Sequence, residues 1–417
     1  MTGIEKTAQE TRNLRWQETF AALKHYNYRL WFGGQVVSLV GTWMQSTAQG
    51  YLIYQITGSL FYLGLVGFVG GAPSLLFTLF GGVIADRLPR RKMLVITQTS
   101  MMILAFILAA LTFTHTVQPW HVLVLAFLLG VANAFDAPAR TSFVLELVDR
   151  SSMTNAIALN STMFNIATVV GPSVAGLTYA AIGPGWCFTL NGLSFIAVIV
   201  ALLFMHIKVQ EQPARRAAAW AELKEGLHYV LKNRMVLSLI GSVGVMSIFG
   251  IGMMNLLPAW ATDVLHGNVT TNGWLVSARG LGSMVSALML AYWGLRKLRG
   301  RLWTVGAFVM PVMLFVFAWL RFLPLALLAL LGVGWGFMMV TNNAQAIVQS
   351  LVPDQLRGRV MGVYTLVFFG SMPLGALLAG SVASKIGEPI TVMGGAALLM
   401  IMAIAAFLFL PDIRRQA

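Results

Sequence analysis

The chain has 417 residues, of which 58% are hydrophobic and 10% charged, and its formal net charge at pH 7 is +14. Soluble domains carry roughly a quarter charged residues, so this composition excludes a water-soluble globule. The apolar residues extend over the whole length in segments near the ~20 residues that cross a bilayer, which predicts a polytopic membrane protein. The basic residues lie in short loops between these segments, so the positive charge indicates topology rather than a nucleic-acid partner.

The N-terminal segment and the cysteine content exclude two further features. Residues 1–28 have no apolar core followed by a small-residue cleavage site, which argues against a signal peptide. We expect them to be a cytoplasmic segment, with the first span inserting directly. The single cysteine, Cys187, lies in an apolar stretch, so we expect neither an intramolecular disulfide nor a metal site.

Twelve segments are predicted as membrane-spanning helices, using an apolar window of about 19 residues and breaks at charge clusters and turns. In chain order they cover residues 29–55, 60–84, 93–115, 120–143, 153–179, 184–207, 235–261, 272–295, 302–320, 323–349, 360–383 and 389–410. An even number of spans places both termini on one side of the membrane. If that side is the cytoplasm, nearly all of the 28 Lys and Arg lie in cytoplasmic segments, as the positive-inside rule requires.

The longest polar interruption, residues 208–234, separates two predicted six-helix bundles at 29–207 and 235–410 and leaves a cytoplasmic tail at 411–417. Within it, apolar and charged residues alternate from Trp220 to Lys232. This pattern predicts an amphipathic helix on the inner membrane surface.

An internal repeat supports the division into two bundles. The pattern L-G-V-x-x-x-F at 129–135 recurs at 331–337, and the Leu-Val before an acid at 147–149 recurs at 351–354. Each copy lies on the corresponding predicted element, which indicates duplication of a six-helix unit. Such repeats build alternating-access transporters, whose substrate site lies at the midplane between the halves.

A charged motif follows the second span, where residues 82–92 read G-x-x-x-D-R-x-P-R-R-K. It resembles the cytoplasmic loop signature of the major facilitator superfamily, G-x-x-x-D-R/K-x-G-x-R/K-R/K, with Pro89 where the family usually has glycine. A stop-transfer cluster would explain the basic residues but not an Asp one turn after a glycine. An ion pair made by such a carboxylate closes the inner face in one state and breaks in the other. The inner-gate candidates are Gly82, Asp86, Arg87, Arg90, Arg91, Asp136 and Arg140.

A second motif, Gly171-Pro172-x-x-x-Gly176, resembles the fifth-helix motif of the superfamily's antiporters, with Ala175 in place of one glycine. Small residues there allow close helix packing, and the proline kinks the span. Together, the stretches 29–55, 82–92, 130–176 and 352–362 resemble the bacterial transmembrane secretion effector branch of the superfamily. That branch includes enterobactin exporters and macrolide efflux proteins, so the resemblance implies export.

The sequence restricts which energy source could drive transport. No lysine follows a glycine anywhere in the chain, so it has no Gly-x-x-x-x-Gly-Lys phosphate loop, and we expect neither ATP hydrolysis nor other enzymatic activity. The resemblance implies proton-coupled antiport, with the proton gradient in place of a cofactor. Asp136 is the acid predicted inside a span, with Arg140 at salt-bridge spacing. Asp136 is therefore either the proton-coupling residue or part of an inner gate with Asp86 and Arg90.

Arg279 is the basic residue predicted within a span, and it has three interpretations. It either snorkels to the outer interface, pairs with Asp263, or faces a central cavity and favours an anionic substrate. Other polar and aromatic residues are cavity candidates because hydrogen-bonding groups are costly against lipid, although contacts between helices would explain each of them. The cavity candidates are Gln35, Thr42, Trp43, Gln45, Gln49, Phe164, Asn165, Asn255, Arg279, Trp335, Asn342 and Gln345.

Together these patterns predict an all-α membrane protein with twelve transmembrane helices in two pseudo-symmetric six-helix bundles. We expect it to export a small or medium amphipathic molecule, siderophore-like, drug-like or other, in exchange for protons. The alternatives are a lipid or lysolipid flippase of the same fold and, in another class, a non-transporting membrane sensor or scaffold. We expect a monomer in the bacterial cytoplasmic (inner) membrane, with the lipid bilayer, a small-molecule substrate and protons as partners and no nucleic acid.

Overall fold

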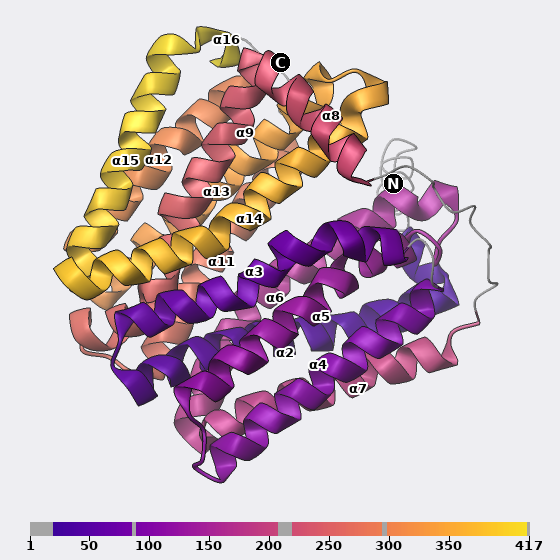
Figure 1. Cartoon of the computed structure of the whole chain (residues 1–417), viewed down its shortest axis with the longest axis vertical. Helices are drawn as coiled ribbons and strands as arrows, with labels where there is room; N and C mark the ends of the chain where they lie inside the picture. Colours follow the sequence, from indigo (N-terminus) through magenta and orange to yellow (C-terminus); the bar gives the residue numbers. More distant parts are fainter. Residues whose placement is uncertain (1–19, 86–88, 207–218, 294–297, 415–417) are drawn as a thin grey trace, which may run out of the picture.

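The computed structural model describes residues 20–85, 89–206, 219–293 and 298–414, and this part of the chain is helical almost throughout (Figure 1). The first half contains a short 3-10 turn at Ala21–Lys24 and another at Arg150–Ser152. Its long helices are α2 (Tyr26–Thr57), α3 (Leu60–Ala85), α4 (Arg90–Phe113), α5 (Pro119–Val144), α6 (Met153–Ile182) and α7 (Pro184–Phe204).

The second half follows α8 (Ala219–Lys232) and opens with a segmented helix at Arg234–Val264. The remaining helices are α11 (Val269–Trp293), α12 (Arg299–Trp319), α13 (Leu323–Leu351), α14 (Asp354–Ile386), α15 (Glu388–Phe409) and the single turn α16 (Pro411–Arg414).

All twelve predicted spans form helices. Eleven helical segments among the described residues are long and apolar enough to cross a membrane, and α2 is the twelfth long helix. α2 has 32 residues, or about 48 Å at its helical rise, but its polar side chains lower its mean hydropathy. Because backbone groups in hydrocarbon must be satisfied within the segment, an apolar run of this length becomes a helix. The all-α, two-bundle fold expected from the sequence is confirmed.

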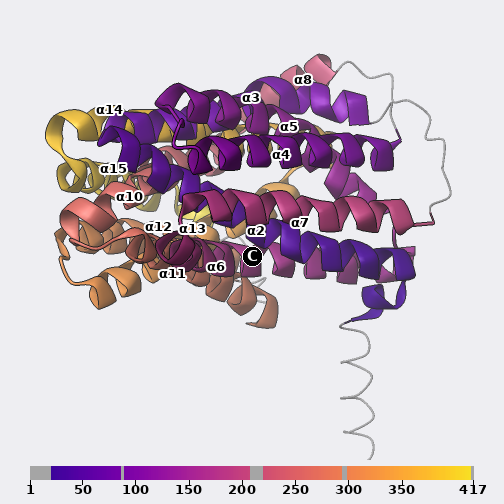
Figure 2. The same cartoon turned by 90° about the horizontal axis from the view of Figure 1, so that it is seen from below.

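Contacts within each half form a bundle, and two pairs of helices make the main contacts between the bundles. α2 packs against α6 and α7, α3 against α5, α13 against α11 and α12, and α12 against α15. An apolar core fills the second half, where Trp260 stacks on Phe317 with 4.5 Å between ring centroids. The connecting pairs are α3 with α14 and α6 with α11. Figure 2 shows these two pairs on opposite sides of the molecule.

The segmented helix differs from the continuous span predicted at 235–261. α9 (Arg234–Met246) is followed by a π turn, a 3-10 turn, the short α10 (Leu257–Ala259) and a second π turn at Trp260–Val264. Pro258 has no N–H to donate to the turn before it. A Cβ atom on Gly252 would lie 2.5 Å from the carbonyl carbon of Gly375, so the irregular part packs directly against α14. Interruptions of this kind often lie at functional sites.

α8 forms where the amphipathic pattern predicts a helix, and it packs against the start of α14. Glu225 makes an ion pair with Arg359 of α14, and a Cβ atom on Gly226 would lie 2.6 Å from the Arg359 carbonyl oxygen. Trp220 and Leu231 remain exposed. α8 is therefore attached to the second half and still presents apolar side chains outward.

Candidate functional site

The contact between α3 and α14, called here the α3–α14 seam, is one of the two main contacts between the halves. Glycine lets its helices approach closely. A Cβ atom on Gly64 would lie 2.9 Å from the Cα atom of Gly380, and one on Gly71 would lie 2.3 Å from Cγ of Pro373. Neither position has room for a larger side chain in this arrangement. The contact therefore depends on small residues in both halves.

The α6–α11 seam adds hydrogen bonds to close packing. The hydroxyl groups of Ser173 and Ser277 are 2.7 Å apart, and Ser277 donates to the Val169 carbonyl oxygen at 2.6 Å. Thr270 donates to the carbonyl oxygen of Gly176 at 3.2 Å. These bonds join α6 of the first half to α11 of the second half.

Both seams lie toward one end of the molecule, which we call the far end because it is opposite to the start of α2 and the end of α15. The other end is called here the terminal end. In Figure 1, α3 and α14 run side by side at the left and diverge toward the right. The halves are thus joined at the far end and separate toward the terminal end.

A hydrogen bond between the halves lies at the far end itself. Tyr54, near the end of α2, donates to the carboxylate of Asp263, which also accepts from Thr262 at 2.8 Å. The sequence analysis offered Asp263 as an ion-pair partner of Arg279, and that alternative is wrong. No described carboxylate lies within the 4.0 Å ion-pair distance of the Arg279 guanidinium.

Asp136 lies inside the first half and is 1% exposed. Its Oδ1 accepts hydrogen bonds from Thr97 Oγ1 at 2.8 Å and Gln98 Nε2 at 2.9 Å, both on α4. Arg140 Nε lies 3.6 Å from its Oδ2, so the pairing expected from their spacing is present. Two hydrogen-bond donors and one guanidinium group therefore surround this carboxylate.

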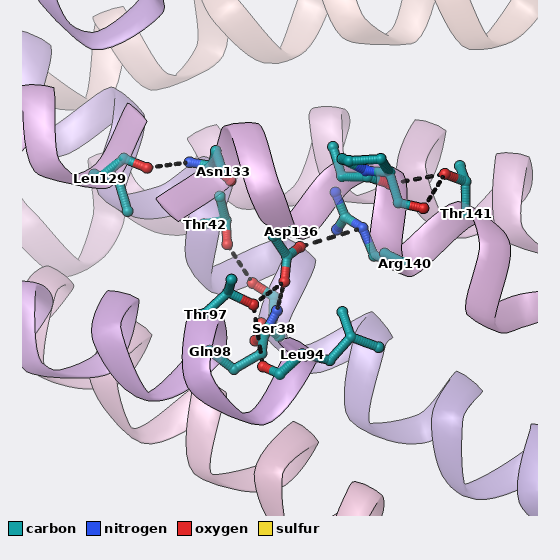
Figure 3. Close-up of polar contacts among 12 residues, drawn as sticks. Ser38, Thr42, Leu94, Thr97, Gln98, Leu129, Asn133, Asp136, Arg140 and Thr141 are labelled. Atoms are coloured by element: carbon teal, nitrogen blue, oxygen red, sulfur yellow. Dashed lines mark hydrogen bonds and ion pairs between the residues drawn. The ribbon is translucent and has the colours of Figure 1, made fainter. Parts of the chain in front are cut away.

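Sequence reasoning missed two residues that bind Asp136, Thr97 and Gln98 of α4 (Figure 3). The cavity candidate Thr42 donates instead to the Ser38 carbonyl oxygen of its own helix, α2. The available signal was the adjacent polar pair Thr97-Gln98 within an otherwise apolar α4. Asp136 therefore joins α4 to α5 within one half, not one half to the other.

The arginines of the charged motif also bind within the first half. Arg90 donates to Glu146 at 2.5 Å, and Arg91 donates to the Leu203 carbonyl oxygen at 2.9 Å. These bonds tie the start of α4 to the end of α5 and to α7. The expected grouping of Arg90 with Asp136 is not seen in these contacts. Gly82 lies in the last turn of α3, and Asp86 and Arg87 lie outside the described residues.

The polar residues of α2 face more than one environment. Gln45 accepts a hydrogen bond from Asn191 of α7 at 2.6 Å, so its amide is engaged inside the first half. Thr42 bonds to a carbonyl one turn earlier, and Gln35 Nε2 is buried without a hydrogen-bond partner. Gln49 is buried. Asn191, which sequence reasoning missed, explains why Gln45 is not available to a central cavity.

The residues of the second motif lie at helix contacts, as their size predicts. A Cβ atom on Gly171 would lie 2.5 Å from Cβ of Trp43, and one on Gly176 would lie 2.9 Å from the Cα atom of Thr270. Pro172 lies inside α6. The first glycine therefore packs against α2 and the second against α11.

An aromatic pair lies where α6 leaves the seam. Trp43 and Phe164 make an edge-to-face contact with 5.8 Å between ring centroids, and Phe164 is 47% exposed. An exposed aromatic face next to the separation between the halves suits a ring-bearing or otherwise apolar ligand.

The remaining cavity candidates have less distinctive environments. Asn165 and Asn255 donate to carbonyl oxygens of their own helices at 2.9 and 3.1 Å. Trp335 and Asn342 on α13 are partly buried, and Gln345 is exposed. The structure does not bring these five residues into one cluster of hydrogen bonds.

Arg279 lies ten residues, or about 15 Å of helical rise, after the start of α11. Its carbonyl oxygen accepts from Ser283, and a Cβ atom on Gly334 of α13 would lie 2.0 Å from the same oxygen. Its Nε atom is buried and has no hydrogen-bond partner. Close packing of α13 therefore positions the backbone of a cationic residue at membrane depth.

The chain matches known families along nearly its whole length. A family model described as transmembrane secretion effector matches residues 17–416. The multidrug efflux pump Tap of Mycolicibacterium fortuitum is 27% identical, over 87% of this chain and 90% of that protein. The staphyloferrin A transporter of Staphylococcus aureus is 25% identical, over 86% and 90%. Macrolide efflux protein A of Streptococcus pyogenes is 23% identical, over 86% and 90%.

Solved structures share the fold at low sequence identity. The nucleoside transporter NupG superposes with a TM-score of 0.72 at 14% identity, covering 92% of this chain and 98% of the transporter. A bacterial homologue of the human lysosomal transporter Spinster, in an inward-facing and occupied conformation, gives a TM-score of 0.74 at 14% identity, covering 94% and 98%. At this identity the likeness establishes the fold alone.

Proposed function

Since the chain belongs to the transmembrane secretion effector family of the major facilitator superfamily, we propose that it exports a small or medium amphipathic molecule in exchange for protons. It acts as a secondary transporter in the bacterial inner membrane, with both termini in the cytoplasm. Export is also the activity in the names of two relatives, a multidrug efflux pump and a macrolide efflux protein.

The position of the two seams is the observation that carries this proposal. Both seams close the far end, while α3 and α14 diverge toward the terminal end (Figure 1). With the termini in the cytoplasm, this arrangement is open to the inside and ready to accept a molecule for export. Alternating access then requires the seams to open and the terminal ends to close.

Asp136 is the proposed proton-coupling residue. It is buried, and its partners on α4 and α5 belong to the first half. Its described hydrogen bonds and ion pair therefore do not connect the two halves. Protonation would weaken the charge-assisted bonds from Thr97, Gln98 and Arg140, because hydrogen bonds to an ionised acceptor are roughly twice as strong as neutral ones. The contact between α4 and α5 would therefore respond to proton binding.

Transport by Asp136→Asn in proteoliposomes tests this role, using fluorescent drug-like dyes of both charges and an imposed pH gradient. We expect the variant to lose gradient-driven dye transport and to keep dye exchange without a gradient. Asp354→Asn is a matched control, because Asp354 also pairs with an arginine on its own helix but is exposed. Loss of both exchange and driven transport in Asp136→Asn would identify a gate residue instead, and full driven transport would remove Asp136 from the mechanism.

A lipid flippase is the second candidate function, and one groove favours it. α4 and α5 enclose a groove of about 510 Å³ with an almost entirely apolar lining that includes the exposed Ile96, Ile103 and Leu128. An acyl chain suits such a lining. Movement of a fluorescent phospholipid between leaflets of proteoliposomes, without transport of the dyes, would support the flippase and refute the exporter.

A further inference from the structure

One face of α11 carries buried polar side chains that have no hydrogen-bond partners among the described residues. Asn272, Arg279 and Ser286 are spaced seven residues apart, so each is rotated by about 20° from the one before and the three span about 40° around the helix. Asn272 is 1% exposed and Ser286 0%. Both side-chain polar atoms of Asn272, Nε of Arg279 and Oγ of Ser286 are buried and lack hydrogen bonds within the structure. A buried polar group without a partner is unfavourable, so this face calls for a ligand or water.

The polar face is distinct from the two other faces of α11. Ser277 and Gly280 lie against α6. Leu281 and Leu288, which are exposed, lie roughly 160–180° from Arg279 around the helix. Arg279 therefore does not share the outward-facing apolar side of α11 and lies on the side of the helix away from these leucines.

The charge of Arg279 is uncompensated by the described residues. No described carboxylate is within the 4.0 Å ion-pair distance of it. A cation at membrane depth is strongly unfavourable unless an anion or a polar cluster compensates it. Helical side chains lean toward the helix N-terminus, which brings the guanidinium toward Asn272. Both groups can then donate hydrogen bonds into the same space.

We propose that this face of α11 binds the anionic group of the transported molecule, with Arg279 as the charged ligand and Asn272 as a neutral donor. The guanidinium forms two parallel hydrogen bonds with a carboxylate, so a carboxylate-bearing amphipathic molecule is the substrate class that fits. The packing of Gly334 against the Arg279 carbonyl oxygen holds the donor in place. This inference rests on the proposed export function for the role of the ligand, but the site itself is tested by binding.

The experiment compares 4-phenylbutyrate with its neutral amide, which differ in charge but not in size. Binding is measured by calorimetry on the full-length protein in phosphatidylcholine nanodiscs without a pH gradient. We expect the carboxylate to bind at least about tenfold more tightly than the amide, a difference typical of one charged contact. Equal affinity for the two probes, or no binding of the carboxylate at millimolar concentration, would overturn the proposal without any variant.

Variants then assign the preference to Arg279. Arg279→Gln should bind both probes equally, and Arg279→Lys should keep part of the preference. Asn272→Ala should weaken carboxylate binding several-fold. Arg321→Gln is the control, because Arg321 is exposed and donates to the carbonyl oxygens of Ala318 and Leu320. A tenfold preference that survives in Arg279→Gln would refute the assignment.

Measurements of binding and of transport distinguish the anion site on α11 from the proposed export function. If the carboxylate preference holds while dye export fails, the anion site stands and the export function falls. If export is intact while the two probes bind equally, the export function stands and the anion site falls.

Discussion

Gly380→Ala offers a direct test of the α3–α14 seam as the contact that holds the far end closed. The added Cβ would lie 2.6 Å from the Leu60 carbonyl oxygen and 2.7 Å from the Cα atom of Gly64. Both are backbone atoms, which cannot rotate away, so the helices must separate. Overpacking of this kind costs about 1–3 kcal/mol. The equilibrium should therefore shift toward an open far end by a factor of about 5 to 150.

Distance measurements between spin labels check this shift. Ala181→Cys at the far end of α6 and Ser384→Cys at the far end of α14 are exposed positions in opposite halves. Cys187→Ser removes the native thiol. We expect Gly380→Ala to add a longer-distance population between the two labels in nanodiscs.

Gly362→Ala is the matched control on the same helix. Nothing lies within 4 Å of a Cβ atom at Gly362, and the gain in helix propensity is the same as at Gly380, about 1 kcal/mol. The control should leave the label distances unchanged. An unchanged distribution in Gly380→Ala, or an equal shift in the control, would refute the seam as the closing contact.

Two further predictions concern single hydrogen bonds. Tyr54→Phe removes the hydrogen bond to Asp263 between the halves. Since such a bond contributes about 0.5–1.5 kcal/mol, the variant should raise the long-distance population of the spin labels by a factor of about 2 to 10. An unchanged population would show that this bond does not help to close the far end. Asn191→Ala leaves the buried Gln45 amide without its partner, and should destabilise the first half by about 1–3 kcal/mol, seen as a lower Tm in detergent. Gln345→Ala, at an exposed position, should leave the Tm within error, and an equal loss there would contradict the argument from burial.

The helices of this protein follow from local properties of the chain. Each apolar run is long enough to cross a bilayer, and a backbone in hydrocarbon satisfies its own hydrogen bonds as a helix. That is why the expected spans and the observed helices agree even for polar α2. The largest shift is at α14, which begins at Asp354 rather than residue 360, because Pro353 and an acidic first turn favour an earlier start.

Some contacts of the candidate site could also be predicted from the spacing of residues along one helix. Asp136 and Arg140 are four residues apart, one helical turn, and their ion pair forms as expected. Gly171 and Gly176 lie at helix contacts because residues without bulk allow close approach. In both cases the signal lies within one helix.

Other contacts join residues from distant parts of the chain, and the spacing of residues in the sequence does not predict such pairs. Thr97 meets Asp136, Asn191 meets Gln45 and Tyr54 meets Asp263 because helices pack in a particular order and rotation. The same packing interrupts the helix at Arg234–Val264 and leaves Arg279 without an ion-pair partner among the described carboxylates. Helix formation depends on hydrogen bonds between near neighbours, whereas the pairing of side chains depends on which faces the assembled bundles bring together.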